Sequence, residues 1–354
     1  MKQFFNAFFL ISIIILCNCK CANLPSTQTE PVISEETVME EIPEIEEDLT
    51  IFIHETGEKL PVVSFGEIWG YVVAGIEAPL TSNLPITDVG YFGAEVDMYG
   101  NLSNVPRRQN LSSFKGRVHL VVTCGSYALT YFTLLPESPQ RAKLIADLID
   151  ATKNFDGLNI DFENIPARSG EAFLSFLREL RAGLPDKIFS VALYGRTRAT
   201  ANDVYDYAKI SALVDKVFIM AYDEHWSTSK PGPISTLRWC RNVAEYALRV
   251  IGREKLIMGI PFYGRAWVDH NHHRAHIYSS IERLIHSHGV KEITRENSTP
   301  TFNYIAQVPV KVYYEDEYSI SARFEMYKSM NIRAVGFWRI GQETKKVWDI
   351  LKIE

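Results

Sequence analysis

The sequence predicts a closed barrel of eight parallel strands alternating with helices, the (β/α)8 or TIM barrel of the α/β class. Short apolar runs rich in β-branched and aromatic residues recur eight times after residue 60, and amphipathic stretches separate most of them. The alternation fills about 290 residues, and such barrels usually take about 250. An open doubly wound sheet is the competing architecture. We favour the barrel because no glycine-rich phosphate loop follows an early strand.

Each predicted element follows from a local pattern. Strands are expected at 68–74, 89–96, 117–124, 157–162, 188–193, 217–221, 256–261 and 334–338. Helices are expected at 139–152, 170–182, 234–250, 318–330 and 343–353, with a weaker one at 204–213. Two prolines in residues 75–87 argue against a full helix there. Residues 269–312, between the seventh and eighth strands, exceed a simple connection and predict an inserted subdomain at the barrel mouth.

Residues 1–21 predict a secretory signal with a lipoprotein processing site. Lys2 precedes an apolar run, residues 4–16, that is too short to cross about 30 Å of hydrocarbon as a helix. The run ends in three cysteines within five residues, which resembles a bacterial lipoprotein site. Cys19 is the expected acylated residue, with Cys17 second; a plain signal peptide is the alternative. We therefore expect an exported protein, anchored to a membrane of the bacterial cell envelope through an acyl chain.

Charge is unevenly distributed along the chain. Of 43 acidic and 37 basic residues, eleven acids and one base lie in residues 22–60, which predicts an acidic, solvated tether. Residues 61–354, the expected catalytic domain, are nearly neutral, so no nucleic-acid partner is indicated. The only cysteines of this domain, Cys124 and Cys240, are expected to be buried thiols rather than a bridge. We expect a monomer.

The fourth predicted strand carries the chemistry. Because side chains alternate along a strand, Asn159, Asp161 and Glu163 share one face, and the apolar residues between them share the other. The polar row then points into the barrel, where buried acids cost several kcal/mol unless they are paired or functional. Glu163, the outermost, suits a proton donor of raised pKa; Asp161, about 6.5–7 Å deeper, would raise that pKa. A purely structural layer of hydrogen-bonded polar groups is the alternative.

Residues 156–163 are similar to the DxxDxDxE signature of family 18 glycoside hydrolases, the chitinase-like barrels. Asp156, Asp161 and Glu163 match its first, third and last acids, and Asn159 replaces the second. The resemblance continues through other strands, at 68–71, 91–94, 220–223, 259–265 and 336–338. Residues 159–164, 222–226 and 231–233 resemble the branch of bacterial spore-cortex and cell-wall N-acetylglucosaminidases, in which asparagine is common at the second acid position.

This resemblance implies a retaining hydrolase that cuts β-1,4-linked N-acetylglucosaminyl bonds, first of all in peptidoglycan, with help from the substrate's own N-acetyl group. It requires no cofactor and no metal. Glu163 would be the general acid and then the base. Asp161 would orient the acetamido group and stabilise an oxazolinium-like intermediate, and Tyr222 would hydrogen-bond the acetamido oxygen. A chitinase or endo-β-N-acetylglucosaminidase acting on chitin or glycoprotein glycans, and a non-catalytic carbohydrate-binding lectin, are the alternatives.

The same resemblance implies a wider substrate-binding set. Asp223 would bind the sugar at the cleavage point, Trp338 would form the floor beneath it, and Tyr71 would line the pocket. Glu224 either contacts sugar or braces Arg265. The remaining matched positions, Met220, Asn159 and Asp156, complete the set.

Three further expectations concern titratable and aromatic residues. Asn159 cannot ionise, so we expect it to leave Asp161 less perturbed than an aspartate would. His272 and His276 could bind a metal if they lay on one helix, although a solvent-exposed loop is the preferred interpretation. Trp69, Trp226 and Trp267 lie near strand ends, where they either stack on sugars or pack in the core.

Overall fold

The computed structural model describes residues 59–77, 80, 84–268, 273–305 and 309–354. The signal with Cys17 and Cys19, nearly all of the acidic tether, His270 and His272 lie outside the described residues. The expectations about export, anchoring and the tether therefore stay predictions. Within the described ranges, no helix has the length and apolar character needed to span a membrane.

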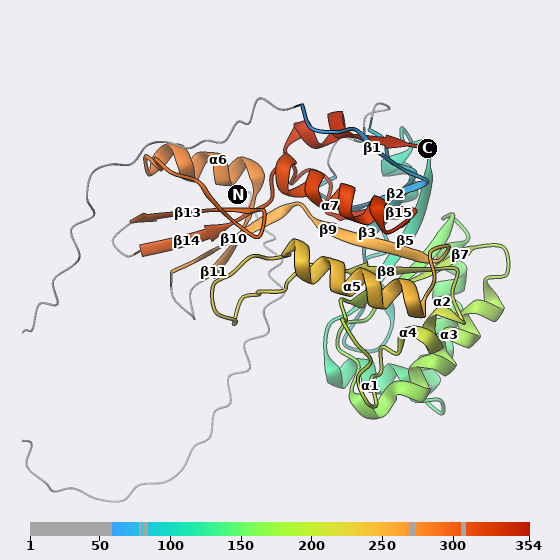
Figure 1. Cartoon of the computed structure of the whole chain (residues 1–354). Coiled ribbons are helices and arrows are strands. Elements are labelled where there is room, and N and C mark those ends of the chain that lie inside the picture. The colour runs from blue at the N-terminus through green and yellow to red at the C-terminus, as the bar shows by residue number, and fades with distance from the viewer. Residues whose placement is uncertain (1–58, 78–79, 81–83, 269–272, 306–308) are drawn as a thin grey trace, which may run out of the picture. The chain divides into compact units, whose positions relative to one another are not determined.

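The eight predicted strands form a closed parallel barrel, in chain order around its axis (Figure 1). The barrel closes where the last strand pairs with the first, with Val335 opposite Ile68. Every observed strand lies within one residue of its predicted bounds. The strands are β2 (Glu67–Val73), β3 (Asp88–Val96), β5 (Arg117–Cys124), β6 (Gly157–Asp161), β7 (Ile188–Tyr194), β8 (Lys216–Met220), β9 (Leu256–Pro261) and β15 (Ala334–Trp338). The predicted (β/α)8 fold is confirmed.

Helices cover the outside of the barrel, as predicted: α2 (Pro139–Thr152), α3 (Gly170–Gly183), α4 (Tyr207–Ser211), α5 (Leu237–Val250) and α7 (Glu317–Ser329). The sequence did not predict α1 (Tyr127–Leu134), which begins where the Ser126 hydroxyl accepts from the Leu129 amide at 3.2 Å. Short 3-10 turns occur at Arg108–Leu111 and Ala167–Ser169. The described part of residues 75–87 contains no helix, as expected.

The helix expected at 343–353 is wrong. Its place is taken by a 3-10 turn (Lys345–Ile350) followed by strand β16 (Leu351–Ile353). β16 pairs in parallel with β1 (Val63–Phe65), from the opposite end of the described chain. Because that partner is far away in sequence, no local pattern could reveal the pairing.

The core has two layers, which follow from the alternation of side chains along the strands. Leu158 and Ile160 of β6 pack outward with the helices, and a smaller apolar cluster fills the barrel interior. Phe218 lies in that interior so close to β15 that a side chain on Gly336 would come within 2.3 Å of its ring. Apolar side chains thus fill the middle of the barrel, and the acids of the predicted site lie above this layer, toward the ends of the strands.

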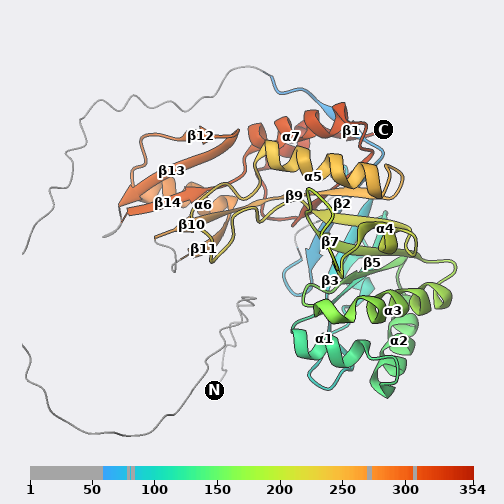
Figure 2. The same cartoon turned by 60° about the horizontal axis from the view of Figure 1, so that its bottom comes forward.

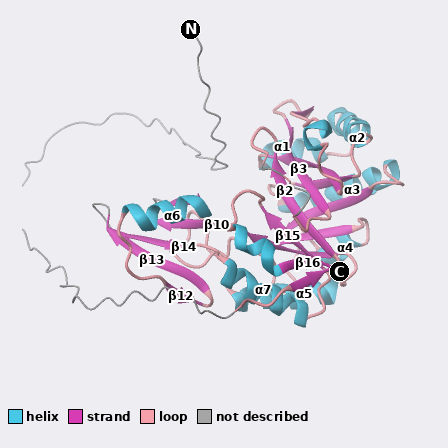
Figure 3. Ribbon diagram, turned by 90° about the horizontal axis from the view of Figure 1, so that it is seen from above, coloured by secondary structure: helices cyan, strands magenta, loops and turns pink. Residues whose placement is uncertain are grey.

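The predicted insertion forms an antiparallel sheet of five strands with one helix packed on it (Figures 2 and 3). Its elements are β10 (Tyr263–Trp267), β11 (His273–Ile277), α6 (Tyr278–Ser287), β12 (Thr294–Glu296), β13 (Thr299–Ile305) and β14 (Pro309–Tyr313). Ile281 and Phe302 contribute to its own core. The sheet begins at Tyr263, earlier than the expected boundary at 269, because β10 is a separate strand rather than the end of β9. Outside the insertion, the two-residue strand β4 (Leu102–Ser103) pairs antiparallel with the end of β3.

Candidate active site

Asn159 lies inside the barrel, and both the oxygen and the nitrogen of its amide are hydrogen-bonded to protein partners. Its Oδ1 accepts from the Tyr71 hydroxyl at 3.2 Å, and its Nδ2 donates to Ser190 Oγ at 2.8 Å. The side chain is completely buried. Asn159 therefore ties the fourth strand to the first and fifth strands and fixes the register from which the next two acids project.

Asp161 lies one residue pair closer to the barrel mouth and is only 5% exposed. Its Oδ1 has no hydrogen-bond partner in the described structure, although buried carboxyl oxygens are normally satisfied. Burial, and then the charge of Glu163, raises its pKa well above the usual range. We expected Asn159 to leave Asp161 less perturbed. Burial is the main cause of the perturbation seen here, and the comparison with an aspartate at position 159 stays a prediction.

Glu163 follows the end of β6 and is partly buried. Burial raises its pKa, the nearby Tyr194 hydroxyl opposes the rise, and the charge of Asp223 adds to it. That hydroxyl also donates to the Glu163 carbonyl oxygen at 2.9 Å, which holds the end of the strand in place. Asp161 and Glu163 therefore titrate as a pair that retains a proton above the ordinary range of carboxyl groups. Such a pair is suited to general acid catalysis.

Tyr222 follows β8 and lies among the other site residues. Burial is the largest cause of its raised pKa, followed by its neighbours Tyr71, Tyr263, Asp161 and Glu163. Its ring meets that of Tyr263 edge-on, at 6.3 Å between centroids. A hydroxyl with a raised pKa stays protonated, so Tyr222 can donate a hydrogen bond toward the two carboxyl groups or toward a ligand between them.

Asp223 is held in an uncommon backbone conformation by side chains from the inserted sheet. Its φ is +56°, a left-handed value that is unfavourable for a residue with a side chain. Its Oδ1 accepts from the Tyr263 hydroxyl at 2.7 Å and from Arg265 Nη2 at 2.9 Å, both on β10. The side chain is still 40% exposed, so it remains accessible to a ligand.

Glu224 does not brace Arg265, which pairs with Asp223 instead. Its Oε2 accepts from the Thr236 amide at 2.8 Å, at the residue that caps α5. Glu224 therefore ties the loop after β8 to the start of that helix. A contact between Glu224 and substrate stays a prediction.

Aromatic side chains form one wall of the site. Trp338, at the end of β15, lies 5.5 Å from the Tyr71 ring and 4.9 Å from the Phe92 ring, between centroids. Met220 belongs to the same inner cluster, and Trp338 and Phe92 border it. The structure thus brings Tyr71, Trp338 and Met220 together with the acids, as predicted, in an arrangement that offers an apolar surface to a sugar ring.

Asp156, the first acid of the motif, does not reach this group. It lies exposed at the start of β6, and its Oδ2 accepts from the Val118 amide of the third barrel strand at 2.7 Å. Seven residues of extended chain separate it from Glu163, or about 23 Å. Its observed contact is structural, because it joins two strands at the opposite end of the barrel.

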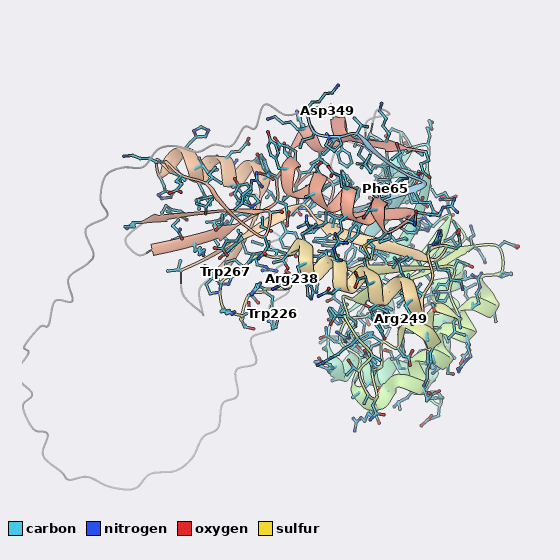
Figure 4. All side chains as sticks on the ribbon, in the orientation of Figure 1. Phe65, Trp226, Arg238, Arg249, Trp267 and Asp349 are labelled. Atoms are coloured by element: carbon cyan, nitrogen blue, oxygen red, sulfur yellow. The ribbon has the colours of Figure 1, made fainter. Side chains whose placement is uncertain are left out.

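Two of the three tryptophans near strand ends are packed rather than free. Trp69 is buried and stacks on the His119 ring at 4.3 Å, and Trp267 is buried in the insertion. Trp226 is 50% exposed, in the loop after β8 (Figure 4). Of these three, Trp226 is therefore the one available for stacking on a ligand.

His276 lies on a strand, β11, rather than on a helix, and one of its ring nitrogens is 3.0 Å from Ser280 Oγ. Burial, with help from Arg274, lowers its pKa to about 4. No group of three or more potential metal ligands occurs in the described ranges. Cys124 and Cys240 are buried and unbridged, as predicted.

The sequence interpretation missed two residues that shape the site. Tyr194 holds the end of the catalytic strand, and Tyr263 holds Asp223. Tyr194 is the last residue of β7, so a search of every predicted strand end for polar side chains would have found it. Nothing local marks Tyr263, whose role depends on the fold of the insertion.

A plugged barrel with a proton-retaining carboxyl pair and an aromatic wall at its strand ends has the architecture of a glycoside hydrolase. Residues 78–343 match the model of the glycosyl hydrolases family 18. The chain belongs to this family, as its motifs indicated.

Its relatives include bacterial sporulation proteins. Over 214 residues it is 29% identical to the putative sporulation-specific glycosylase YdhD of Bacillus subtilis, covering 56% of this chain and 51% of that protein. Over 243 residues it is 26% identical to the cortical fragment-lytic enzyme of B. subtilis, covering 62% of this chain and 54% of that protein. The chain thus matches only about half the length of these relatives. The crystal structure of the spore cortex-lytic enzyme SleL from Bacillus cereus shares the fold, with a TM-score of 0.72 and 24% identity over 84% of this chain and 76% of SleL.

Proposed function

We propose that this protein hydrolyses β-1,4 bonds on the reducing side of N-acetylglucosamine in peptidoglycan, with retention and with participation of the substrate's acetamido group. One observation carries the proposal. Asp161 at the end of β6 and Glu163 just after it have raised pKa values, and the deeper one, Asp161, keeps a buried oxygen without a hydrogen-bond partner among the described residues, near Tyr222. Peptidoglycan is the proposed polymer because sporulation and cortex-lytic proteins are among the relatives.

The proposed reaction starts with proton transfer from Glu163 to the glycosidic oxygen. As the bond from that oxygen to C1 breaks, the acetamido oxygen of the same sugar attacks C1 and forms a cyclic oxazolinium ion. The partnerless Oδ1 of Asp161 would accept the acetamido N–H and stabilise the positive charge. Glu163, now ionised, takes a proton from water; the resulting hydroxide attacks C1 and restores the acetamido group. Both carboxyl groups end as they began.

Tyr222 and Asp223 would position the reacting sugar. Tyr222, kept protonated by its raised pKa, would donate to the acetamido oxygen and aim it at C1. Asp223, immobilised by Tyr263 and Arg265, would accept from a sugar hydroxyl. Trp338 would lie under the ring.

The test is digestion of purified peptidoglycan and of chitooligosaccharides by the wild type and by Glu163→Gln, with mass analysis of the product ends. We expect new reducing N-acetylglucosamine ends from peptidoglycan, and a rate about 10²–10⁴ lower in the variant. Cleavage of chitooligosaccharides alone would replace peptidoglycan by chitin as the substrate. Binding of glycan by the wild type without any cleavage would identify a lectin and refute the proposed function.

A further inference from the structure

We propose that a depression beside the catalytic strand is a subsite for a sugar that carries a carboxylate, and that Arg168 recognises this carboxylate. The inference rests on the proposed function and deepens it, because it names the feature of the glycan that the protein selects. The depression has a volume of about 640 Å³ and is lined by Tyr127, Ala128, Tyr131, Pro166, Ala167 and Arg168.

The depression lies on the same end of the barrel as the acids. Thr123 of β5 is opposite Asp161 of β6, so the chain segments that follow, 125–131 and 164–168, leave the barrel side by side. Tyr205 holds the chain that runs from Asp161 to the depression. Its hydroxyl donates to the Phe162 carbonyl at 3.0 Å and accepts from the Ile165 amide at 3.1 Å.

Electrostatics place the wall of the depression near the same tyrosine. Burial chiefly raises the pKa of Tyr205; among the charged groups, Glu163 acts most strongly, followed by Tyr127 and Asp161. Tyr127 therefore lies close enough to Tyr205 to interact with it, as do both acids. A glycan whose cleaved bond rests on Glu163 would extend its neighbouring units toward Tyr127.

The lining has the chemistry of a saccharide subsite with a cationic rim. Tyr127 is 61% exposed at the start of α1, so its ring is open to a ligand that enters the depression. Arg168 lies with its guanidinium carbon 4.1 Å from the centroid of the Tyr131 ring. Stacking of this kind fixes the plane of the guanidinium and leaves its N–H groups along the edge.

Arg168 makes no ion pair or hydrogen bond to any described residue, although it is exposed and oriented. A planar guanidinium whose N–H groups have no hydrogen-bond partner among the described residues matches a carboxylate, which it can bind through two parallel hydrogen bonds. Peptidoglycan supplies such groups on its peptide stems and on lactyl ethers that carry no stem, and chitin has none. Arg168 would thus distinguish acidic glycan strands from neutral ones.

The chain offers a matched control. Arg249, on α5, is also exposed (Figure 4), and its guanidinium carbon lies 5.4 Å from the centroid of the Tyr246 ring; neither residue lines the depression. Arg168→Gln and Arg249→Gln therefore remove the same charge and the same kind of stacking. Both side chains are exposed, so both variants should fold, and circular dichroism checks this.

The experiment measures kcat/KM of the wild type and of Arg168→Gln, Arg168→Lys and Arg249→Gln on peptidoglycan strands and on chitotetraose. Arg168→Gln should lower kcat/KM on peptidoglycan about tenfold, mainly through KM, and leave chitotetraose unchanged. Arg168→Lys should retain part of the preference because it keeps the charge but not the fork. Amidation of the peptidoglycan carboxylates should abolish the difference. Equal losses on both substrates, or none on either, would overturn the proposal.

Binding separates this inference from the proposed function. In the Glu163→Gln background, calorimetry measures the Kd of a disaccharide–tetrapeptide purified from peptidoglycan. Adding Arg168→Gln should raise this Kd about tenfold, and adding Arg249→Gln should not change it. An unchanged Kd would refute the subsite even if the wild type cleaves peptidoglycan. Failure of cleavage with the Kd effect present would refute only the proposed reaction.

Discussion

A buried ion pair that is hydrogen-bonded, through Ser235, to the residue before Tyr222 allows a quantitative prediction. Arg323 of α7 binds Glu315 through two hydrogen bonds of 2.9 Å, and the two side chains are 2% and 0% exposed. Arg323 also donates to the Ser235 carbonyl. Ser235 Oγ in turn donates to the Ala221 carbonyl at 2.7 Å, one residue before Tyr222. The pair therefore supports the segment that carries two of the proposed substrate contacts.

Arg323→Met should leave the Glu315 carboxylate buried and unpaired. The expected loss in the free energy of unfolding is about 3–5 kcal/mol, a large part of the roughly 5–15 kcal/mol that stabilises a typical domain. The double variant Glu315→Leu/Arg323→Met removes both charges and should come within about 1 kcal/mol of the wild type. Urea unfolding followed by circular dichroism measures both values. If the double variant is as unstable as the single one, the unpaired charge is not the cause.

Activity separates support of the site from support of the fold. Both variants lack the Arg323 guanidinium that donates to the Ser235 carbonyl. Under conditions in which each variant is fully folded, both should therefore have a lower kcat than the wild type. The double variant should thus regain stability without regaining kcat. A double variant that recovers both would show that Arg323 does not position the Tyr222 segment.

Three predictions concern the acids and their partner. Because Glu163 must hold a proton to donate it, kcat/KM should fall as pH rises through the raised pKa of Glu163. The charge of Asp223 contributes to that raised pKa, so Asp223→Asn should move this fall in kcat/KM to lower pH. If the fall in kcat/KM occurs at the same pH in Asp223→Asn and in the wild type, Asp223 does not act on Glu163. Asn159→Asp places a second carboxyl about 6.5–7 Å from Asp161, which at an effective dielectric of about 20 costs about 2.5 kcal/mol, or nearly two pKa units, when both ionise. A profile identical to that of the wild type would refute this coupling. Tyr222→Phe should lower kcat about 10–100-fold with little change in KM, measured on chitooligosaccharides, whereas a change in KM alone would assign Tyr222 to ground-state binding.

The barrel could be predicted because its evidence is local. Each strand is a short apolar run, and alternation along residues 157–163 was enough to turn Asn159 and Asp161 inward. What failed depended on distant partners. β16 pairs with a strand at the other end of the chain, and α1 is too short to show a helical period.

The site could be predicted in part, for a similar reason. The motif identified Asp161 and Glu163, but it grouped with them Asp156, which lies at the other end of the same strand. The alternation of side chains tells which face of the strand a residue lies on, but not whether it lies near the end of the barrel that carries the site. The partner of Arg265 could not be chosen either, since Asp223 and Glu224 are neighbours in sequence and only the left-handed turn at Asp223 separates their contacts.

The early start of the inserted sheet has a consequence for protein engineering. Tyr263 and Arg265, which immobilise Asp223, belong to the first strand of that sheet and not to the barrel. A truncation that removed β10 to β14 and joined β9 to α7 would yield a simpler barrel in which Asp223 loses both of these partners. If the inserted sheet were exchanged between homologues, the loop after β8 would have to be exchanged with it, because Tyr263 and Arg265 of the sheet hydrogen-bond to Asp223 of that loop.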